Sequence, residues 1–128
     1  MILCLKTDNP VAELFVMDET GERAKEIWQA DRTLARDLLT HLEALVVPLG
    51  DWTALKGLVV YQGPGSFTGL RIGITVMNTL ADGLKIPIVG VQGDDWLTNG
   101  LERIAAGDND RIVLPEYGAP PRITSPRK

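Results

Sequence analysis

The fold of this chain is decided by residues 55–73, which read LKGLVVYQGPGSFTGLRIG. Residues 58–61 (LVVY) form a short, β-branched run that is apolar on both faces, which is typical of a buried parallel strand. The glycine-rich turn after this run opens a segment with helical periodicity, predicted to extend from about Phe67 to Gly83. A buried strand that leads directly into a helix indicates a mixed α/β fold.

Further strands and helices are expected on both sides of this unit. Three short strands at residues 1–6, 11–17 and 22–28 are separated by short turns, which predicts an antiparallel three-stranded meander. A fifth strand is expected at Pro87–Val91 and a third helix at Trp96–Ala106. The order βββαβαβα, with right-handed crossovers, predicts a mixed five-stranded sheet in a single ribonuclease-H-like half-fold.

The first helix is indicated by leucines at three- and four-residue spacing, which lay one apolar stripe along a helix. These leucines are Leu34, Leu38, Leu42, Leu45 and Leu49. Asp31 or Thr33 is expected to cap the start of the helix, and Pro48 with Gly50 to mark its end.

Length and composition exclude several classes of protein. The 128 residues suffice for one compact domain, and the net charge of −4 disfavours binding of nucleic acid by bulk charge. The single cysteine, Cys4, cannot form a disulfide within the chain. No apolar run approaches the ~18 residues of a membrane span, and the first residues lack the pattern of a signal peptide. We therefore expect a soluble, cytoplasmic protein without a membrane partner.

Charge divides the chain into two parts. Residues 1–110 carry nine basic and sixteen acidic side chains, whereas residues 111–128 carry four basic and one acidic, together with four of the eight prolines. This division predicts one lobe over 1–110 and a basic, proline-rich tail over 111–128, most of it extended or disordered. Such a tail is either a solvated C-terminus or an arm that lies on an acidic partner or on RNA.

The glycine-rich turn has the backbone character of a phosphate site, because a strand-to-helix turn aims N–H groups and the helix dipole at one point. Neither standard phosphate motif is present, however. A Walker A sequence is absent, and the dinucleotide fingerprint fails at Thr68, where its third glycine belongs. The simpler interpretation is a tight turn at Pro64 and Gly65, followed by a helix cap from Ser66 or Thr68.

Two glycines, Gly69 and Gly73, lie on one face of the helix that follows. A glycine inside a helix costs about 1 kcal/mol relative to alanine, so two of them predict a compensating close contact. Small residues let two helices approach closely, and the second helix is either the leucine-rich helix or a helix of another chain. We therefore interpret this helix as a packing surface rather than a phosphate site.

Other candidate chemistry is weak. His41 is the only histidine and has no second soft ligand near it in sequence, which disfavours a metal site. Cys4 lies in the first strand and is expected to be a core residue. Ser66 lacks the glycine that a nucleophile elbow needs at position 68. No catalytic residue, metal or cofactor is therefore expected.

The chain resembles the bacterial TsaB (YeaZ) family over most of its length. The motif at residues 63–73, the leucine-rich helix and residues 84–91 (LKIPIVGV) occur in the order typical of that family. The resemblance implies an actin-like (ASKHA) fold of two similar lobes. It also implies a role in forming N6-threonylcarbamoyladenosine in tRNA without catalysis of its own. The implied partners are a catalytic subunit, TsaD, and a small ATPase, TsaE, with homodimers when TsaD is absent and tRNA contacted indirectly at most.

The resemblance also implies which residues take part. The residues expected to contact TsaD lie on the two helices and are Leu34, Leu38, Leu42, Phe67, Gly69, Leu70, Gly73, Ile74 and Met77. The loop that carries the motif contains Gly63, Pro64, Gly65, Ser66, Thr68 and Arg71. On this basis, Gly73→Arg is expected to abolish binding of TsaD without harming the fold.

Two departures from the family favour a helper protein over an enzyme. Lys6-Thr7-Asp8 stands where the family usually has Asp-Thr-Ser, and lysine does not ligate Mg²⁺. The second lobe is also missing from the sequence, so one lobe would offer half of a nucleotide cleft. The leading hypothesis is a non-catalytic, single-lobe subunit. The alternatives are a nucleotide-binding hydrolase that uses the Gly63–Gly69 loop, and a homodimeric interaction module.

Overall fold

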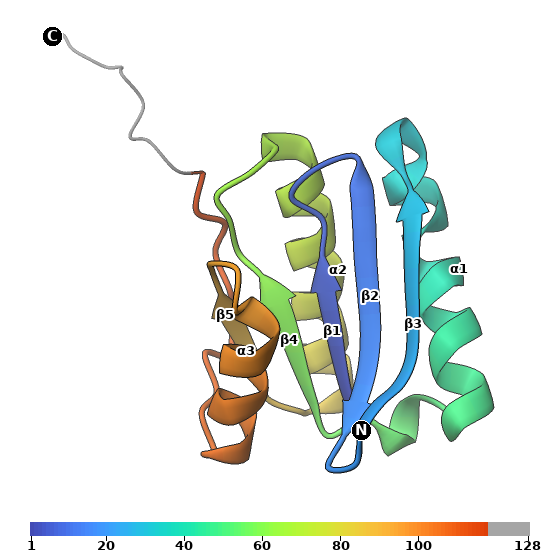
Figure 1. Ribbon diagram of the computed structural model, residues 1–128, viewed down its shortest axis with the longest axis vertical. Helices are drawn as coiled ribbons and strands as arrows, with labels where there is room; N and C mark the ends of the chain where they lie inside the picture. The colour runs from blue at the N-terminus through green and yellow to red at the C-terminus, as the bar shows by residue number, and fades with distance from the viewer. Residues whose placement is uncertain (118–128) are drawn as a thin grey trace, which may run out of the picture.

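The computed structural model of the chain describes residues 1–117, which form one five-stranded sheet flanked by three α-helices (Figure 1). The strand order across the sheet is β3-β2-β1-β4-β5. The strands are β1 (Ile2–Lys6), β2 (Val11–Asp18), β3 (Gly21–Gln29), β4 (Gly57–Tyr61) and β5 (Ile88–Val91). The predicted α/β class and the mixed five-stranded sheet are confirmed.

The sheet has an antiparallel half and a parallel half. β1 pairs with β2, and β2 with β3, in antiparallel fashion, as short turns between successive strands require. β4 pairs with β1, and β5 with β4, in parallel fashion, since a helix lies between the strands of each pair. β4 is buried along its whole length, which explains its apolar sequence.

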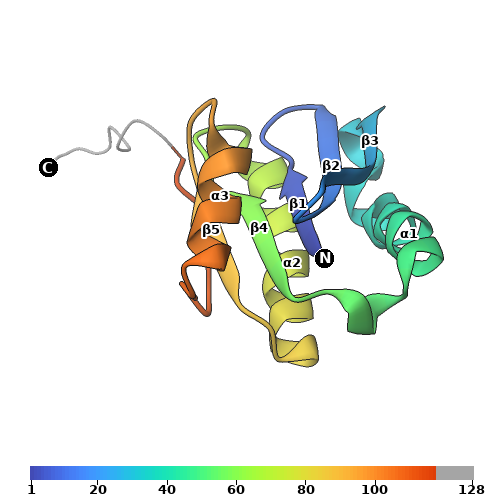
Figure 2. The same ribbon diagram turned by 60° about the horizontal axis from the view of Figure 1, so that its bottom comes forward.

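The helices cover both faces of the sheet. α1 (Leu34–Val46) and α2 (Phe67–Leu84) lie side by side on one face, and α3 (Trp96–Ala105) lies on the other (Figure 2). α1 contacts β2 and β3, α2 contacts β1, β4 and β5, and α3 contacts β4 and β5. α2 therefore begins at the carboxyl end of the central parallel strands.

The core lies between the sheet and the apolar stripes of the helices. Leu34, Leu38 and Leu42 of the predicted stripe are buried, while Leu45 and Leu49 are partly buried. From α2 the core receives Leu70, Ile74, Met77 and Ala81, and β1 contributes Leu3 and Leu5. These side chains are removed from water by the chain's own sheet, which stabilises the lobe by the hydrophobic effect.

The helix ends differ in part from the predicted caps. Thr33 is the N-cap residue of α1, but its hydroxyl donates to the carbonyl oxygen of Ala30 at 2.7 Å and does not cap the helix. Asp31 instead begins a short 3-10 turn (Asp31–Thr33). Ser66 is the N-cap residue of α2 and makes no side-chain capping bond. The caps predicted at Thr33 and Ser66 are therefore wrong, whereas the 3-10 turn Val47–Leu49, with Gly50 at its end, follows α1 where Pro48 and Gly50 predict the helix to end.

The residues after α3 lie against the lobe as far as Tyr117. Val113 is only 2% exposed, and Asn78 of α2 bonds to both backbone groups of Val113. Val113 is thus an apolar core residue, whereas Ile112, Leu114 and Tyr117 beside it are exposed, so the interpretation of the tail as a solvated C-terminus stays a prediction. The division after residue 110 stays a prediction, and residues 118–128 of the predicted tail lie outside the described residues. No helix within residues 1–117 has the length and apolar character to cross a membrane.

Candidate functional site

The turn between β4 and α2 is packed tightly against the β1–β2 turn. The backbone N–H of Ser66 donates to the carbonyl oxygen of Asp8 at 2.7 Å. A Cβ on Gly65 would lie 2.7 Å from the same oxygen, which only glycine avoids. This glycine therefore brings two backbone segments together, and one of the N–H groups that a phosphate cradle would use is already paired within the chain.

Gly69 and Gly73 also face the β1–β2 turn. Thr7 is buried there, and its hydroxyl donates to the carbonyl oxygen of Gly69 at 2.8 Å. A Cβ on Gly69 would overlap the Thr7 carbonyl oxygen, and a Cβ on Gly73 would overlap the Thr7 hydroxyl. The predicted close contact exists, and the group nearest to each added Cβ is Thr7 of the same chain rather than a helix. Gly73→Arg would consequently disrupt the fold, so the expectation that it spares the fold is wrong.

Most of the residues expected to contact a partner lie inside the lobe. The buried ones are Leu34, Leu38, Leu42, Leu70, Gly73, Ile74 and Met77. Gly69 is half-buried, and Phe67 is 55% exposed. Helical periodicity identifies an apolar face without showing what covers it, and here the chain's own sheet covers it. Of this set, only Phe67 offers a large exposed side chain to another molecule.

The loop residues divide in the same way. Gly63 is buried, whereas Pro64, Gly65, Ser66, Thr68 and Arg71 are exposed. The guanidinium carbon of Arg71 lies 5.1 Å from the centre of the Phe67 ring, which is within the range of a cation–π contact. An aromatic ring and a cationic group therefore stand together at the exposed start of α2.

A shallow groove of about 380 Å³ lies between α1 and α2 beside Phe67. Its lining residues are Ala35, Phe67, Thr68, Arg71, Ile72, Thr75 and Val76. Leu39, one turn beyond Ala35 on α1, is 55% exposed. The groove thus combines an apolar floor with an exposed aromatic ring and an arginine, which are the residue types enriched at protein–protein contacts.

Sequence reasoning missed Ala35, Leu39, Ile72 and Val76. The signal was present, because Ala35 with Leu39 and Ile72 with Val76 each recur at four-residue spacing next to the core stripe. A second apolar stripe beside the first widens the apolar face beyond what the sheet covers. Only the packing of the two helices shows which of the stripes stays exposed.

Lys6, at the end of β1, neutralises the acidic side chains around it. Its Nζ lies 2.6 Å from Asp8 Oδ1 and 4.0 Å from Glu13 Oε2. The same Nζ lies 4.5 Å from the centre of the Tyr61 ring. Lys6 thus supplies the positive charge that balances the carboxylates of Asp8 and Glu13. Among residues 1–117, no three His, Cys, Asp or Glu side chains form a group that could hold a metal ion.

The remaining nucleophilic and titratable candidates are Cys4 and His41, and both have structural roles. Cys4 is fully buried, and burial raises the pKa of its thiol far above the ordinary value. His41 Nδ1 lies 2.9 Å from Glu26 Oε2, and its ring stacks on Trp28 at a centroid distance of 4.0 Å. The histidine therefore links α1 to β3.

These features define an α/β lobe with a tightly packed glycine-rich turn and an exposed groove between two helices. A family model described as "TsaD: tRNA N6-adenosine threonylcarbamoyltransferase" matches residues 33–103, just over half of the chain. The chain therefore belongs to this family, and its relatives place it with the TsaB (YeaZ) proteins.

Two curated relatives carry the name tRNA threonylcarbamoyladenosine biosynthesis protein TsaB. The protein of Escherichia coli (strain K12) is 40% identical over 67 residues, which cover 47% of this chain and 29% of the relative. The protein of Bacillus subtilis (strain 168) is 42% identical over 67 residues, which cover 51% of this chain and 26% of the relative. The chain thus spans less than a third of either relative.

A solved structure, YeaZ from Pseudomonas aeruginosa, is similar in fold. Its TM-score is 0.66 at 28% sequence identity, and the match covers 71% of this chain and 43% of that chain. The likeness therefore extends over most of the lobe described above, whereas more than half of the YeaZ chain has no counterpart in the match.

Proposed function

We propose that this chain is a non-catalytic subunit of the complex that forms N6-threonylcarbamoyladenosine in tRNA. Its partner in this proposal is a TsaD-type catalytic subunit, with a TsaE-type ATPase in the same complex. The names of the TsaB relatives and the family of the chain support this role. Contact with tRNA would then be made through the partner, in the cytoplasm.

The fold supports the proposal as a single ribonuclease-H-like (actin-like) lobe. A meander followed by two parallel strands, with two helices on one face and one on the other, is the arrangement that such a half-fold needs.

The groove between α1 and α2 is the observation that carries the proposal. Phe67 lines the groove with an exposed ring, and Arg71 adds a charge that lies against that ring. Leu39, one turn beyond the lining residue Ala35 on α1, exposes a further large apolar side chain. Aromatic residues and arginine at the centre of an interface contribute most of its binding energy. We propose this groove, with Phe67 at its edge, as the surface that binds the catalytic subunit.

The surroundings of the turn and of Lys6 support a role without catalysis. The Ser66 N–H is paired with Asp8, so it is not aimed at a ligand. Lys6 occupies the acidic pocket formed by Asp8 and Glu13. At both places, groups that could otherwise face a phosphate or a cation make contacts within the chain.

A nucleotide-binding hydrolase that uses the Gly63–Gly69 loop is the alternative from the enzyme class. It would need the loop to withdraw from Asp8 before its N–H groups could reach a phosphate. Calorimetric titration with ATP and ADP in the presence of Mg²⁺ separates the two functions. Tight nucleotide binding by the isolated chain would favour the hydrolase, and its absence at millimolar nucleotide would favour the helper subunit.

The proposal is tested by titrating a TsaD-type subunit with variants of the groove. Phe67→Ala and Leu39→Ala should each weaken binding by about tenfold or more, because each removes a large apolar contact. Ile27→Ala is the matched control, since Ile27 is equally exposed but lies on β3. Unchanged affinity in both groove variants would refute the proposed surface. Light scattering of the chain alone would show whether a homodimer competes for the same groove.

A further inference from the structure

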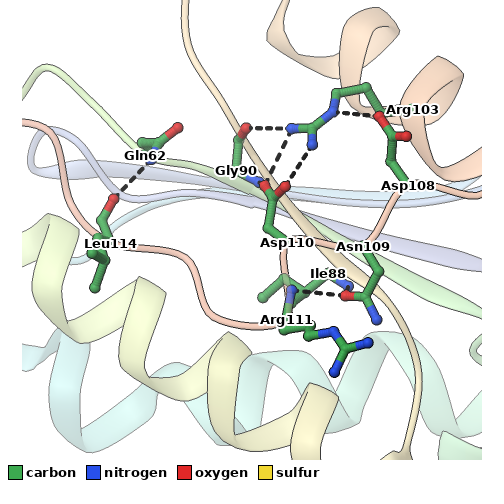
Figure 3. Close-up of polar contacts among 9 residues, drawn as sticks. All are labelled: Gln62, Ile88, Gly90, Arg103, Asp108, Asn109, Asp110, Arg111 and Leu114. Carbon is green, nitrogen blue, oxygen red and sulfur yellow. Dashed lines mark hydrogen bonds and ion pairs between the residues drawn. The ribbon is translucent and has the colours of Figure 1, made fainter.

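The segment after α3, residues 108–117, crosses the lobe from the end of α3 to the start of α2; we call it the strap. Figure 3 shows its first half beside β5. The strap lies beyond residues 33–103, the part that the family model matches.

The strap first closes the outer edge of β5. The Ile88 N–H donates to Asn109 Oδ1 at 3.1 Å, and the Ile88 carbonyl accepts from the Asp110 N–H at 2.8 Å. The Gly90 N–H donates to Asp110 Oδ2 at 2.8 Å, and the Gly90 carbonyl accepts from Arg103 Nη1 at 3.0 Å (Figure 3). The free backbone groups of an edge strand are thereby satisfied, and a further strand cannot add there.

Arg103, in the last turn of α3, fixes the beginning of the strap. Its Nε lies 3.0 Å from Asp108 Oδ2, and its Nη1 lies 3.2 Å from Asp110 Oδ2 (Figure 3). Its Nη2 lies 2.5 Å from Asp110 Oδ1. One guanidinium therefore joins α3, β5 and the strap, and its planar fork matches the carboxylate geometry.

The middle of the strap is buried against β5 and α2. Asn78 Nδ2 donates to the Val113 carbonyl at 3.0 Å, and the Val113 N–H donates to Asn78 Oδ1 at 2.9 Å. A Cβ on Gly90 would lie 2.6 Å from Val113 Cγ1, so the glycine makes room for this side chain. The position of the strap is therefore set by a reciprocal hydrogen-bonded pair and by a buried apolar residue.

The end of the strap lies against the motif turn. Gln62 Nε2 donates to the Leu114 carbonyl at 2.8 Å, and the Glu116 N–H donates to the Gln62 carbonyl at 2.7 Å. A Cβ on Gly63 would overlap the Glu116 carbonyl oxygen. The first glycine of the motif thus accommodates the strap, which gives it a role other than holding phosphate.

The end of the strap adjoins the exposed ring of Phe67. The Tyr117 ring lies 4.7 Å from the Phe67 ring, centroid to centroid. Ile112 and Leu114 are 67% and 68% exposed, although the strap itself is held firmly in place. Tyr117 therefore adjoins the groove at Phe67, and Leu114, three positions before it, exposes a further apolar side chain on the same ordered segment.

We propose that the strap is part of the surface that binds the catalytic subunit, with Leu114 and Tyr117 contacting the partner and Arg103 acting as a positioning residue. This inference rests on the proposed function. The partner is assigned by continuity, because Tyr117 touches Phe67 at the edge of the groove. Arg103 contacts no partner itself but holds the strap so that Tyr117 lies on Phe67.

Two measurements on the full chain test this inference. Hydrogen exchange of the Gly90 and Val113 amides, followed by NMR, reports whether the strap is seated. Titration of a TsaD-type subunit reports binding. Arg103→Gln should speed exchange at Gly90 by about tenfold and weaken binding by about fivefold. Leu114→Ala should weaken binding to a similar degree but leave exchange at Gly90 unchanged.

Matched controls separate the strap from the groove. Arg23→Gln removes an arginine that pairs with Asp18 at 2.7 Å, far along the chain from the strap, and Ile27→Ala removes an exposed apolar side chain from β3. Both should bind as the parent chain does. If Phe67→Ala loses binding while Leu114→Ala and Arg103→Gln keep it, the role of the strap is refuted and the groove stands. If Phe67→Ala and Leu39→Ala also bind normally, the groove is refuted as the docking surface and this inference fails with it. The proposed function itself fails if the parent chain does not bind the TsaD-type subunit.

Discussion

The hydroxyl of Thr7 donates a 2.8 Å hydrogen bond to the carbonyl oxygen of Gly69 and thereby ties the end of β1 to the first turn of α2. Thr7 is buried, and Gly69 and Gly73 leave the space that its side chain and backbone occupy. The absence of a side chain at the two glycines therefore allows one threonine of the same chain to pack closely against α2.

Gly73→Ala should destabilise the lobe by about 1–3 kcal/mol, because the added methyl group would overlap the Thr7 hydroxyl. This loss should exceed the gain in helix propensity, which is about 1 kcal/mol. The free energy of unfolding in urea measures the difference. The double variant that also carries Thr7→Ala should lose less stability than the sum of the two single variants, since Thr7→Ala removes the clash.

Gly83→Ala provides the matched control, as it lies in the same helix with no heavy atom within 4 Å of its added Cβ. It should stabilise the chain by roughly 0.5–1 kcal/mol. A destabilised Gly83→Ala, or a Gly73→Ala that is as stable as the parent chain, would contradict this account of the two glycines.

Lys6→Met should destabilise the chain by roughly 1–3 kcal/mol, because Asp8 and Glu13 would lose the cation that neutralises them in a largely buried setting. Thermal or urea unfolding at neutral pH measures the loss. Arg36→Met is the comparison, since Arg36 pairs with Asp37 on an exposed part of α1 and its removal should leave the free energy of unfolding nearly unchanged. Equal effects of the two substitutions would contradict the role given to Lys6.

The elements of the fold could be predicted because their signals are local. The β-branched run of β4 and the leucine spacing of α1 each report the local secondary structure, and the observed strands and helices begin and end close to the predicted ones. The absence of side-chain caps at Thr33 and Ser66 could not be predicted. The Thr33 hydroxyl bonds back to the Ala30 carbonyl, and the Ser66 backbone N–H bonds to Asp8.

The candidate site was harder to predict from sequence for a physical reason. Periodicity shows that Leu38 and Ile74 lie on apolar faces, but only three-dimensional packing shows that the chain's own sheet covers them. The close contact at Gly73 was expected, whereas its partner, Thr7, is 66 positions away in the sequence. Val113 was hidden in a proline-rich stretch whose composition suggests solvent exposure.

Cys4 should be inert in the folded chain. Its thiol is buried, and burial raises its pKa, so the reactive thiolate is scarce at neutral pH and no reagent reaches it. Reaction with an aromatic disulfide reagent should be at least about 100-fold slower in buffer than in concentrated urea, because it requires unfolding. Since Cys4 is the only cysteine, the readout has a single source. Rapid reaction in buffer would mean that β1 is accessible.

The seating of the strap should weaken in acid. Partial burial alone would raise the pKa of Asp110, but the hydrogen bonds from Arg103 and from the Gly90 N–H outweigh it, so the pKa is lowered. A carboxyl whose pKa is lower in the folded than in the unfolded state stabilises the fold above its unfolded pKa of about 3.9. That contribution is lost as the pH falls through the folded pKa.

Asp110→Asn should therefore be less stable than the parent chain at pH 7, and the difference in the free energy of unfolding should close progressively below about pH 4. Urea unfolding of both proteins across this range measures the gap, with Asp94→Asn as the control for an exposed carboxyl. A gap that stays constant with pH would show that the charge of Asp110 does not hold the strap.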